Sequence, residues 1–232
     1  MIDFNPHLEI LPQAQRRLWD ELSQVASKGF VLYGGTAIAL HLGHRNSVDF
    51  DFFTNLNFNT ETLLSSFSFT KDGKVLQRTQ NTLTVITKED VKISFFGGIT
   101  FGRVASPFRT QPASVIVASL DDLLATKLKT LFDRIESKDY KDIAAMLRHG
   151  INLSKGLASG KAMFGDHFQP SEALKALTYF HGGDLDSLGD SDRSTLIKAA
   201  REVHDLPSVQ ILSHELGCPA AQPEKKRRCR MR

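Results

Sequence analysis

Two aspartates one residue apart, Asp49 and Asp51, are the side chains of this sequence best suited to hold a cation. They alternate with Phe50 and Phe52, a pattern typical of a β-strand, which would place both carboxylates on one face about 6 to 7 Å apart. Carboxylates that close repel each other unless a positive charge lies between them. A hard cation such as Mg²⁺, or Mn²⁺, takes oxygen ligands and leaves positions open for phosphates. The pair therefore predicts a metal site for a phosphorylated substrate.

Three small residues upstream suit the phosphates of that substrate. Gly34 and Gly35 follow the apolar segment FVLY, and Thr36 begins a stretch of helical character. Backbone without side chains at a helix N-terminus lets phosphate oxygens approach amide N–H groups, and the threonine hydroxyl is a further donor. Each feature alone is common in turns and on solvated faces. Their order, with the paired aspartates on the next strand, predicts a metal–nucleotide site.

The surrounding segments predict a mixed α/β first half. Apolar residues at helical spacing over 13–28 end at Gly29, which suits a C-terminal cap, and residues 60–67 form a second predicted helix. Strands joined by hairpins are predicted from β-branched content and turn residues at 67–78, 81–96 and 113–119.

The apolar spacing becomes helical from residue 119 onward, with Ser119 as the expected N-cap and Asp122 as its partner. Helices are predicted at 120–134, 138–149, 171–180 and 191–204. The segment DLDSLGD at 184–190 lacks the ligand pattern of a calcium loop, and we expect it to cap the helix that follows. We predict an α/β domain over 1–118 and a helical domain over 119–223.

The net charge of +3 comes from the last nine residues, 224–232, which carry six basic side chains and one acidic one. The rest of the chain has 23 basic and 25 acidic residues. We expect this basic tail to be disordered and not to define the function. The sequence has no apolar run of membrane-spanning length and no signal-peptide pattern at its start, so we expect a cytoplasmic protein without membrane contact.

The string GGTAIALHLGHRNSVDFDFF, residues 34–53, resembles the signature of the nucleotidyltransferase superfamily. More narrowly it is similar to the AbiEii/MenT branch, toxins of type IV toxin–antitoxin and phage-defence systems, in which a GGTAL…HR.S.D.D string is typical. That branch also carries a later helical lysine and a K/R-D-x-x-D element. The segments LLATKLKTLFDR and SKDYKDI match them, which points to Lys127, Asp139 and Asp142.

The resemblance covers roughly residues 30–145 and implies a minimal nucleotidyltransferase fold of the α+β class, followed by a helical domain. It implies transfer of a nucleoside monophosphate from an NTP to an acceptor, with tRNA 3′ ends as the leading acceptor and an antitoxin encoded nearby as a possible partner. The implied roles are triphosphate binding by Gly34, Gly35 and Thr36, metal binding by Asp49 and Asp51, neutralisation of phosphate charge by Arg45 and Lys127, and action as general base or acceptor orientation by Asp139, with Asp142 beside it.

One departure from the superfamily pattern concerns the third carboxylate. The strand VKISFF carries Ser94 where an acid is expected, and serine ligates Mg²⁺ weakly. Three readings remain open: a one-metal enzyme that relies on Asp139, which we favour, an enzyme that recruits Glu89 or Asp90, and a nucleotide- or RNA-binding module without catalysis. A phosphotransferase or nucleotidyltransferase acting on a small molecule is a further alternative.

Overall fold

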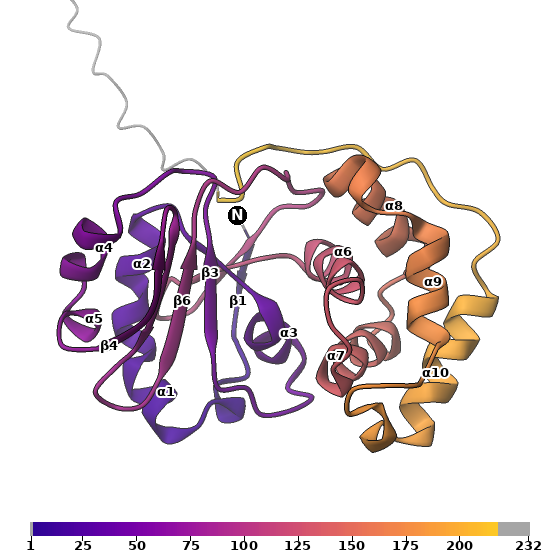
Figure 1. Cartoon of the computed structure of the whole chain (residues 1–232), viewed down its shortest axis with the longest axis horizontal. Helices are drawn as coiled ribbons and strands as arrows, with labels where there is room; N and C mark the ends of the chain where they lie inside the picture. The colour runs from indigo at the N-terminus through magenta and orange to yellow at the C-terminus, as the bar shows by residue number, and fades with distance from the viewer. Residues whose placement is uncertain (1, 218–232) are drawn as a thin grey trace, which may run out of the picture.

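A mixed β-sheet lies beside a bundle of helices in the computed structural model, which describes residues 2–217 (Figure 1). Within those residues the sheet has eight strands in the order β1-β7-β8-β2-β3-β6-β5-β4. The strands are β1 (Ile2–Phe4), β2 (Val31–Tyr33), β3 (Phe50–Phe53), β4 (Lys74–Thr79), β5 (Thr82–Ile86), β6 (Lys92–Phe96), β7 (Phe108–Thr110) and β8 (Ile116–Val117). The predicted α+β class is confirmed.

Strand β3 carries Asp51 into the middle of this sheet. It pairs antiparallel with β2 and parallel with β6, and β5 and β4 continue the sheet to its edge in antiparallel order. The side chains of Phe50 and Phe52 point into the core and have no exposed surface, while the residues between them face the other side. The alternation that the sequence predicts is therefore present.

Helices cover both faces of the sheet. On one face lie α1 (Gln13–Leu18), α2 (Ser23–Ser27), α4 (Thr60–Ser66) and α5 (Ser68–Lys71), and on the other lies α3 (Gly34–Leu42) (Figure 1). The helix predicted over 13–28 is interrupted by a 3-10 turn at Trp19–Leu22, and it ends as expected before Gly29, whose φ is +81°.

One prediction for the first half is wrong. Residues 67–70 alternate like a strand, but Ser68–Lys71 form the helical turn α5, because Phe67 before it is buried and stacks on Phe69 at 5.2 Å while the Thr70 hydroxyl donates to the Leu64 carbonyl. The hairpin to β5 therefore begins only with β4, and its turn lies at Asn81, whose φ is +58°. The short strands β1 and β7 have no counterpart in the sequence analysis.

The second half consists of α6 (Leu120–Thr130), α7 (Ser137–Arg148), α8 (Leu153–Phe164), α9 (Pro170–Thr178) and α10 (Asp190–Arg201). Ser119 caps α6 by accepting a hydrogen bond from the Asp122 amide, as predicted. Helix α8 is not predicted, because Gly156 and Gly160 lower helix propensity. Both glycines allow close packing: a Cβ on Gly156 would meet Leu124 of α6, and one on Gly160 would lie 2.7 Å from the Phe168 ring.

The loop at 184–190 caps a different helix from the predicted one. The carboxylate of Asp184 accepts hydrogen bonds from the backbone N–H and the hydroxyl of Ser137, at 2.5 and 2.7 Å, at the start of α7. No side chain caps α10, the following helix. Because α7 carries Asp139 and Asp142, this distant loop helps to position them.

After α10 the chain runs back across the molecule to the sheet (Figure 1). Ser213 bridges to Arg103, and the Leu216 amide donates to the Asn55 side chain at 2.6 Å. The secondary structure changes from strands to helices between Val117 and Leu120. The returning segment, however, packs with the first half. The division into two domains stays a prediction. The predicted tail, 224–232, lies outside the described residues. None of the described helices is long and apolar enough to span a membrane.

Candidate active site

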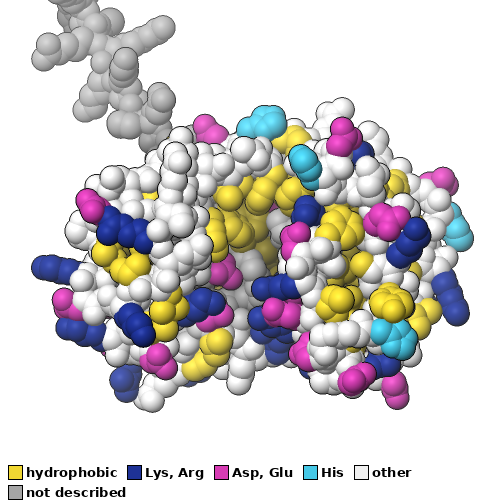
Figure 2. Space-filling view, viewed as in Figure 1, with side chains coloured by type: hydrophobic (Ala, Val, Ile, Leu, Met, Phe, Trp, Pro, Cys, Tyr) yellow, Lys and Arg dark blue, Asp and Glu magenta, His cyan; other side chains and the backbone are white. Residues whose placement is uncertain are grey.

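A cavity of about 530 Å³ lies where the sheet meets α3, α6 and α7. In the space-filling view it is part of a hollow between the two halves, with acidic and basic side chains on its walls (Figure 2). Two carboxylates line it, together with the cationic side chains of Arg45, Lys92, Lys127, Arg134 and Lys138. The excess of positive charge suits a polyanionic ligand.

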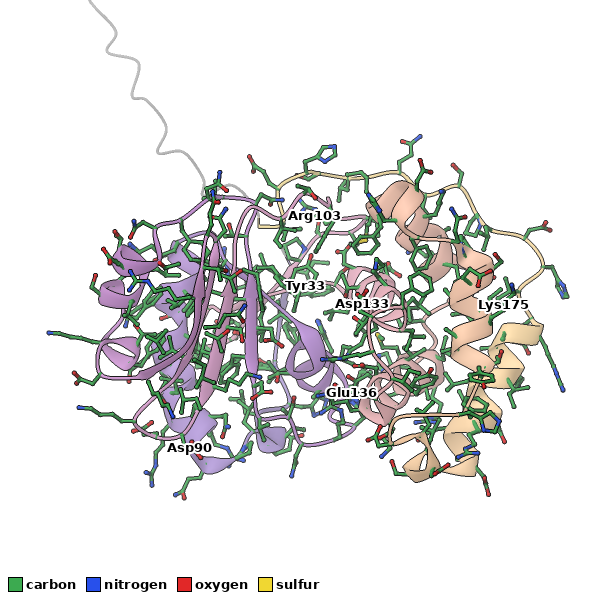
Figure 3. All side chains as sticks on the ribbon, in the orientation of Figure 1. Tyr33, Asp90, Arg103, Asp133, Glu136 and Lys175 are labelled. Atoms are coloured by element: carbon green, nitrogen blue, oxygen red, sulfur yellow. The ribbon has the colours of Figure 1, made fainter. Side chains whose placement is uncertain are left out.

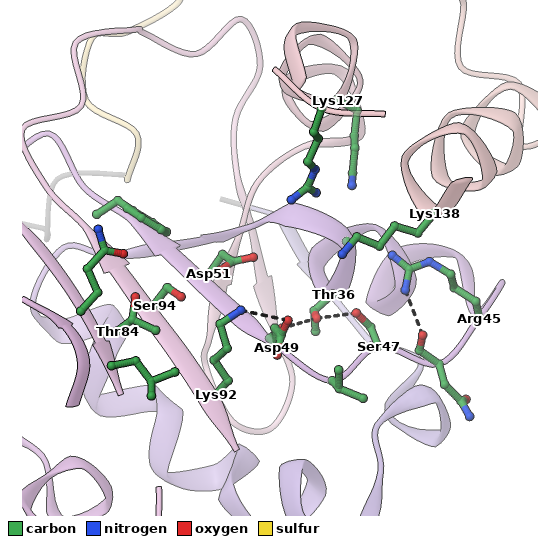
Figure 4. Close-up of a pocket in the computed structure, with 17 residues that line it drawn as sticks. Thr36, Arg45, Ser47, Asp49, Asp51, Thr84, Lys92, Ser94, Lys127 and Lys138 are labelled. Atoms are coloured by element: carbon green, nitrogen blue, oxygen red, sulfur yellow. Dashed lines mark hydrogen bonds and ion pairs between the residues drawn. The ribbon is translucent and has the colours of Figure 1, made fainter. Parts of the chain in front are cut away.

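The carboxylate pair, Asp49 and Asp51, lines this cavity, and its role in binding a metal stays a prediction (Figure 4). Asp51 lies on β3 and Asp49 immediately precedes it, with the Lys92 ammonium 3.4 Å from one Asp49 oxygen. Burial raises the pKa of Asp51, and the neighbouring Asp49 raises it further. Among residues 2–217 no three His, Cys, Asp or Glu side chains surround one point, so a cation held here would need further oxygen ligands from phosphates or water.

The two glycines make room for charged side chains. Gly34 has a φ of +74°, and a Cβ on it would lie 2.9 Å from a carboxylate oxygen of Asp51. A Cβ on Gly35 would meet the guanidinium of Arg45. Gly35 also lines the cavity at the N-terminus of α3. The Gly-Gly pair is therefore needed for the positions of Asp51 and Arg45, in addition to its predicted role in phosphate binding.

Thr36 is buried, and its hydroxyl already has protein partners. It donates to the carbonyl oxygen of Asp49 and lies 2.7 Å from the Ser47 hydroxyl (Figure 4). These bonds hold the loop that enters β3 against the start of α3. Its contacts favour a role in positioning Asp49. Thr36 also lines the cavity, and its predicted role as a hydrogen-bond donor to phosphate stays a prediction.

A buried ion cluster joins α6, α7 and the loop after α3. The Lys127 ammonium lies 2.5 Å from Asp139 and 3.0 Å from Asp142. Arg45 donates two hydrogen bonds to Asp142, at 2.6 and 2.9 Å. Arg134 donates two to Asp139, at 2.9 and 3.2 Å. The two carboxylates are fully buried, whereas all three cations reach the cavity.

The cluster keeps both of its carboxylates ionised. Burial raises the pKa of Asp142, but hydrogen bonds from His44 and Arg45 and the charge of Lys127 outweigh it and hold that pKa well below its usual range. Burial also raises the pKa of Asp139, but the hydrogen bonds and charges of Arg134 and Lys127 outweigh burial, so this pKa is lowered. A buried carboxylate with two cationic partners and a lowered pKa accepts a proton poorly. These contacts favour Asp139 and Asp142 as residues that hold cations, and the general-base role of Asp139 stays a prediction.

Sequence reasoning missed Arg134 and Lys138 as lining residues. Both belong to the segments that match the later motifs, LLATKLKTLFDR and SKDYKDI. Their closeness to Asp139 in the sequence could therefore have indicated that they line the cavity. Ser94 is buried next to Asp51 on the neighbouring strand β6. Glu89 and Asp90, the alternative carboxylates, do not line the cavity, and Asp90 lies in the exposed β5–β6 turn at the edge of the molecule (Figure 3).

Comparison with known proteins agrees with this geometry. The family described as nucleotidyl transferase AbiEii toxin, type IV TA system, matches residues 17–210. An uncharacterized protein of Aquifex aeolicus (strain VF5) is 30% identical over 172 residues, which cover 69% of this chain and 80% of that protein. The family match covers strands β2 to β8, the residues that line the cavity, and helices α6 to α10. The chain belongs to the AbiEii family of nucleotidyltransferase toxins of type IV toxin–antitoxin systems.

Proposed function

We propose that this nucleotidyltransferase moves a nucleoside monophosphate from an NTP to the 3′ end of an RNA, most suitably a tRNA, with a divalent cation held by Asp49 and Asp51. The observation that carries the proposal is a cavity with a carboxylate pair on its sheet wall and, across from it, four cations from α6, α7 and the adjoining loops. We call these four, Arg45, Lys127, Arg134 and Lys138, the cationic side.

The cationic side suits the β- and γ-phosphates of the NTP. Arg45, Lys127 and Arg134 are held by buried carboxylates, so their positions are set before a ligand arrives. Phosphoryl-type transfer depends mainly on such positioning and on electrostatic stabilisation of the leaving group. Asp139 and Asp142, which hold these cations, would therefore affect the reaction only by positioning the cations.

The residues present also fit a divalent cation. Two carboxylates face one cavity, where the Lys92 ammonium lies 3.4 Å from Asp49, and burial together with the charge of Asp49 raises the pKa of Asp51. A further positive charge between the two carboxylates would favour their ionised forms. A bound Mg²⁺ or Mn²⁺ would supply that charge and neutralise the phosphate oxygens. Ser94 adds no charge, so the described residues that line the cavity offer ligands for one cation rather than a fully formed two-metal site.

The proposed reaction balances without a further reactant. The acceptor hydroxyl oxygen forms a bond to the α-phosphorus, and the bond from that phosphorus to the bridging oxygen breaks. Pyrophosphate leaves on the cationic side, and the hydroxyl proton passes to solvent. A positively charged cavity favours an RNA acceptor over a polycationic small molecule, which would need acidic walls.

Transfer of label from α-³²P NTPs to total tRNA in the presence of Mg²⁺ tests the proposal. We expect labelled RNA with the wild type and none with Asp51→Asn. Asp90→Asn is the matched control, because it removes the carboxylate of the exposed turn, and it should retain activity. Label on a small molecule in a cell extract, or NTP binding without any transfer, would refute the RNA acceptor or the enzyme activity, respectively.

The type IV family implies an antitoxin partner for this toxin. We propose that it is encoded beside this chain and that it relieves growth arrest caused by the transferase. Expression of the wild type should arrest growth, expression of Asp51→Asn should not, and co-expression of the neighbouring reading frame should restore growth. Arrest by both variants would show that toxicity does not require the reaction.

A further inference from the structure

A row of polar side chains crosses the sheet from Asp51 to the edge strand β4. Asp51 pairs in register with Ser94 on β6, Ser94 with Thr84 on β5, and Thr84 with Gln77 on β4. Directly paired residues of neighbouring strands point to the same face, and each step is about 4.8 Å, so the row extends about 14 Å from Asp51. All four side chains line the cavity. We call Ser94, Thr84 and Gln77 the polar row.

The polar row and the cationic side lie on opposite sides of the carboxylate pair. Figure 4 shows Ser94 and Thr84 on one side, and Lys127 and Lys138 on the other. In transfer to phosphorus the attacking and leaving oxygens are roughly in line. If pyrophosphate leaves toward the cationic side, the acceptor hydroxyl must approach from the side of the polar row.

The chemistry of the polar row suits a nucleoside. Its members offer two hydroxyls and one amide and carry no charge, and Leu76, Phe96 and the cationic Lys92 line the cavity beside them. Ribose hydroxyls and the edge of a base bind to such neutral donors and acceptors, and the flat face of a base packs on apolar side chains. Ser94 and Thr84 are buried, whereas Gln77 is exposed on a strand that is exposed throughout. The row therefore leads from the reaction centre to an open edge, where a longer strand can continue.

We propose that the polar row is the acceptor subsite, in which the last nucleoside of an RNA lies with its ribose hydroxyls toward Asp51 and its base near Gln77 and Leu76. The proposal rests on the proposed function and names how that site takes its acceptor. It also gives Ser94 a role, because its hydroxyl beside Asp51 can hydrogen-bond a ribose hydroxyl.

Binding of a short 5′-fluorescein-labelled single-stranded RNA with a free 3′-hydroxyl, measured by fluorescence anisotropy, tests the subsite without requiring catalysis. Loss of one neutral hydrogen bond should weaken RNA binding roughly 3- to 10-fold in Thr84→Val and in Gln77→Ala. Binding of a non-hydrolysable NTP analogue with Mn²⁺ should stay within about twofold, since one neutral bond lost elsewhere does not reach the phosphates. Matched controls are Thr82→Val on the same strand and Gln80→Ala in the adjoining turn, neither of which lines the cavity.

Equal RNA affinity in all variants, no RNA binding by the wild type, or a parallel loss of NTP analogue binding would each overturn the subsite. Failure of the proposed reaction gives a different result. A wild type that binds RNA through Thr84 and Gln77 but transfers no label would uphold the subsite and refute the reaction. Normal transfer kinetics in both variants would uphold the reaction and refute the subsite.

Discussion

Gly34 and Gly35 show how single residues determine the site. Each lacks a side chain where Asp51 or Arg45 approaches the start of α3, and any Cβ there would displace a charged group. The sequence alone relates these glycines to phosphate contacts. It does not reveal their protein neighbours, because Arg45 reaches Gly35 only when Asp142, nearly a hundred residues later in the chain, holds its guanidinium.

Gly35→Ala tests this packing. The added methyl group should displace the Arg45 guanidinium and weaken binding of an NTP analogue about 10- to 100-fold, the effect of losing one charge-assisted hydrogen bond. Gly189→Ala is the matched control, because a Cβ on Gly189 meets no atom within 4 Å. Isothermal titration calorimetry of both variants would measure the difference, and wild-type affinity in Gly35→Ala would refute the proposed role of Arg45.

Lys127→Met tests the buried ion cluster. Removal of the ammonium leaves Asp139 and Asp142 buried with one fewer cation each, and the free energy of unfolding should fall by about 2 to 4 kcal/mol. Lys129→Met, on the same helix with a more exposed partner, should change it by less than about 1 kcal/mol. Urea denaturation measures both values. Equal losses would contradict a special contribution of Lys127.

At the scale of elements, the start of α6 carries a buried acid that is not part of the reaction. Asp122 accepts hydrogen bonds from the Val104 amide and the Ser119 hydroxyl, at 2.7 Å each. Burial raises the pKa of Asp122 to about 6 despite these bonds. Between the unfolded and folded pKa values, about pH 4 to 6, the folded protein binds more protons than the unfolded chain, so this residue lowers stability as the pH rises.

Asp122→Asn should remove that loss. The variant should gain about 2 to 3 kcal/mol of unfolding free energy relative to the wild type as the pH rises from about 4 to about 6. Asp121→Asn, the more exposed neighbour, controls for loss of one carboxylate at the same helix terminus. Urea denaturation at several pH values checks the prediction, which a pH-independent difference between Asp122→Asn and the wild type would contradict.

Elements with strong local signals were predicted well, and those that depend on distant contacts were not. The alternating Phe50 and Phe52 identified β3, and Ser119 identified the start of α6. In contrast, α8 was missed because it contains two glycines, which allow close contact with Leu124 and Phe168. A helical turn was also missed after Phe67, where the residues alternate as in a strand. The sequence indicated Arg45, Lys127, Asp139 and Asp142 as site residues. It could not show that the two carboxylates hold the cations in place.

At the scale of the whole molecule, the returning C-terminal segment ties the helical half to the sheet. Arg103 is buried and donates to the carbonyl of Glu215 at 2.9 Å, and Leu216 is 1% exposed. The cavity lies between the sheet and the helices that this segment connects (Figure 1). No local pattern in the sequence predicts where such an extended segment packs.

Leu216→Ala tests this connection. Loss of the buried side chain should lower the free energy of unfolding by about 2 to 4 kcal/mol. Leu212→Ala, in the same segment but 57% exposed, should change it by less than about 0.5 kcal/mol. Thermal and urea unfolding of the two variants would compare them. A similar stability of both would mean that the segment does not hold the halves together.

The most direct test of the central claim compares two labels on one NTP. With tRNA and Mg²⁺ present, transfer of a nucleoside monophosphate predicts that α-³²P label appears on the RNA and that γ-³²P label leaves with pyrophosphate. Label on the RNA from the γ-position would instead show phosphate transfer, and would contradict the assignment of pyrophosphate to the cationic side of the cavity.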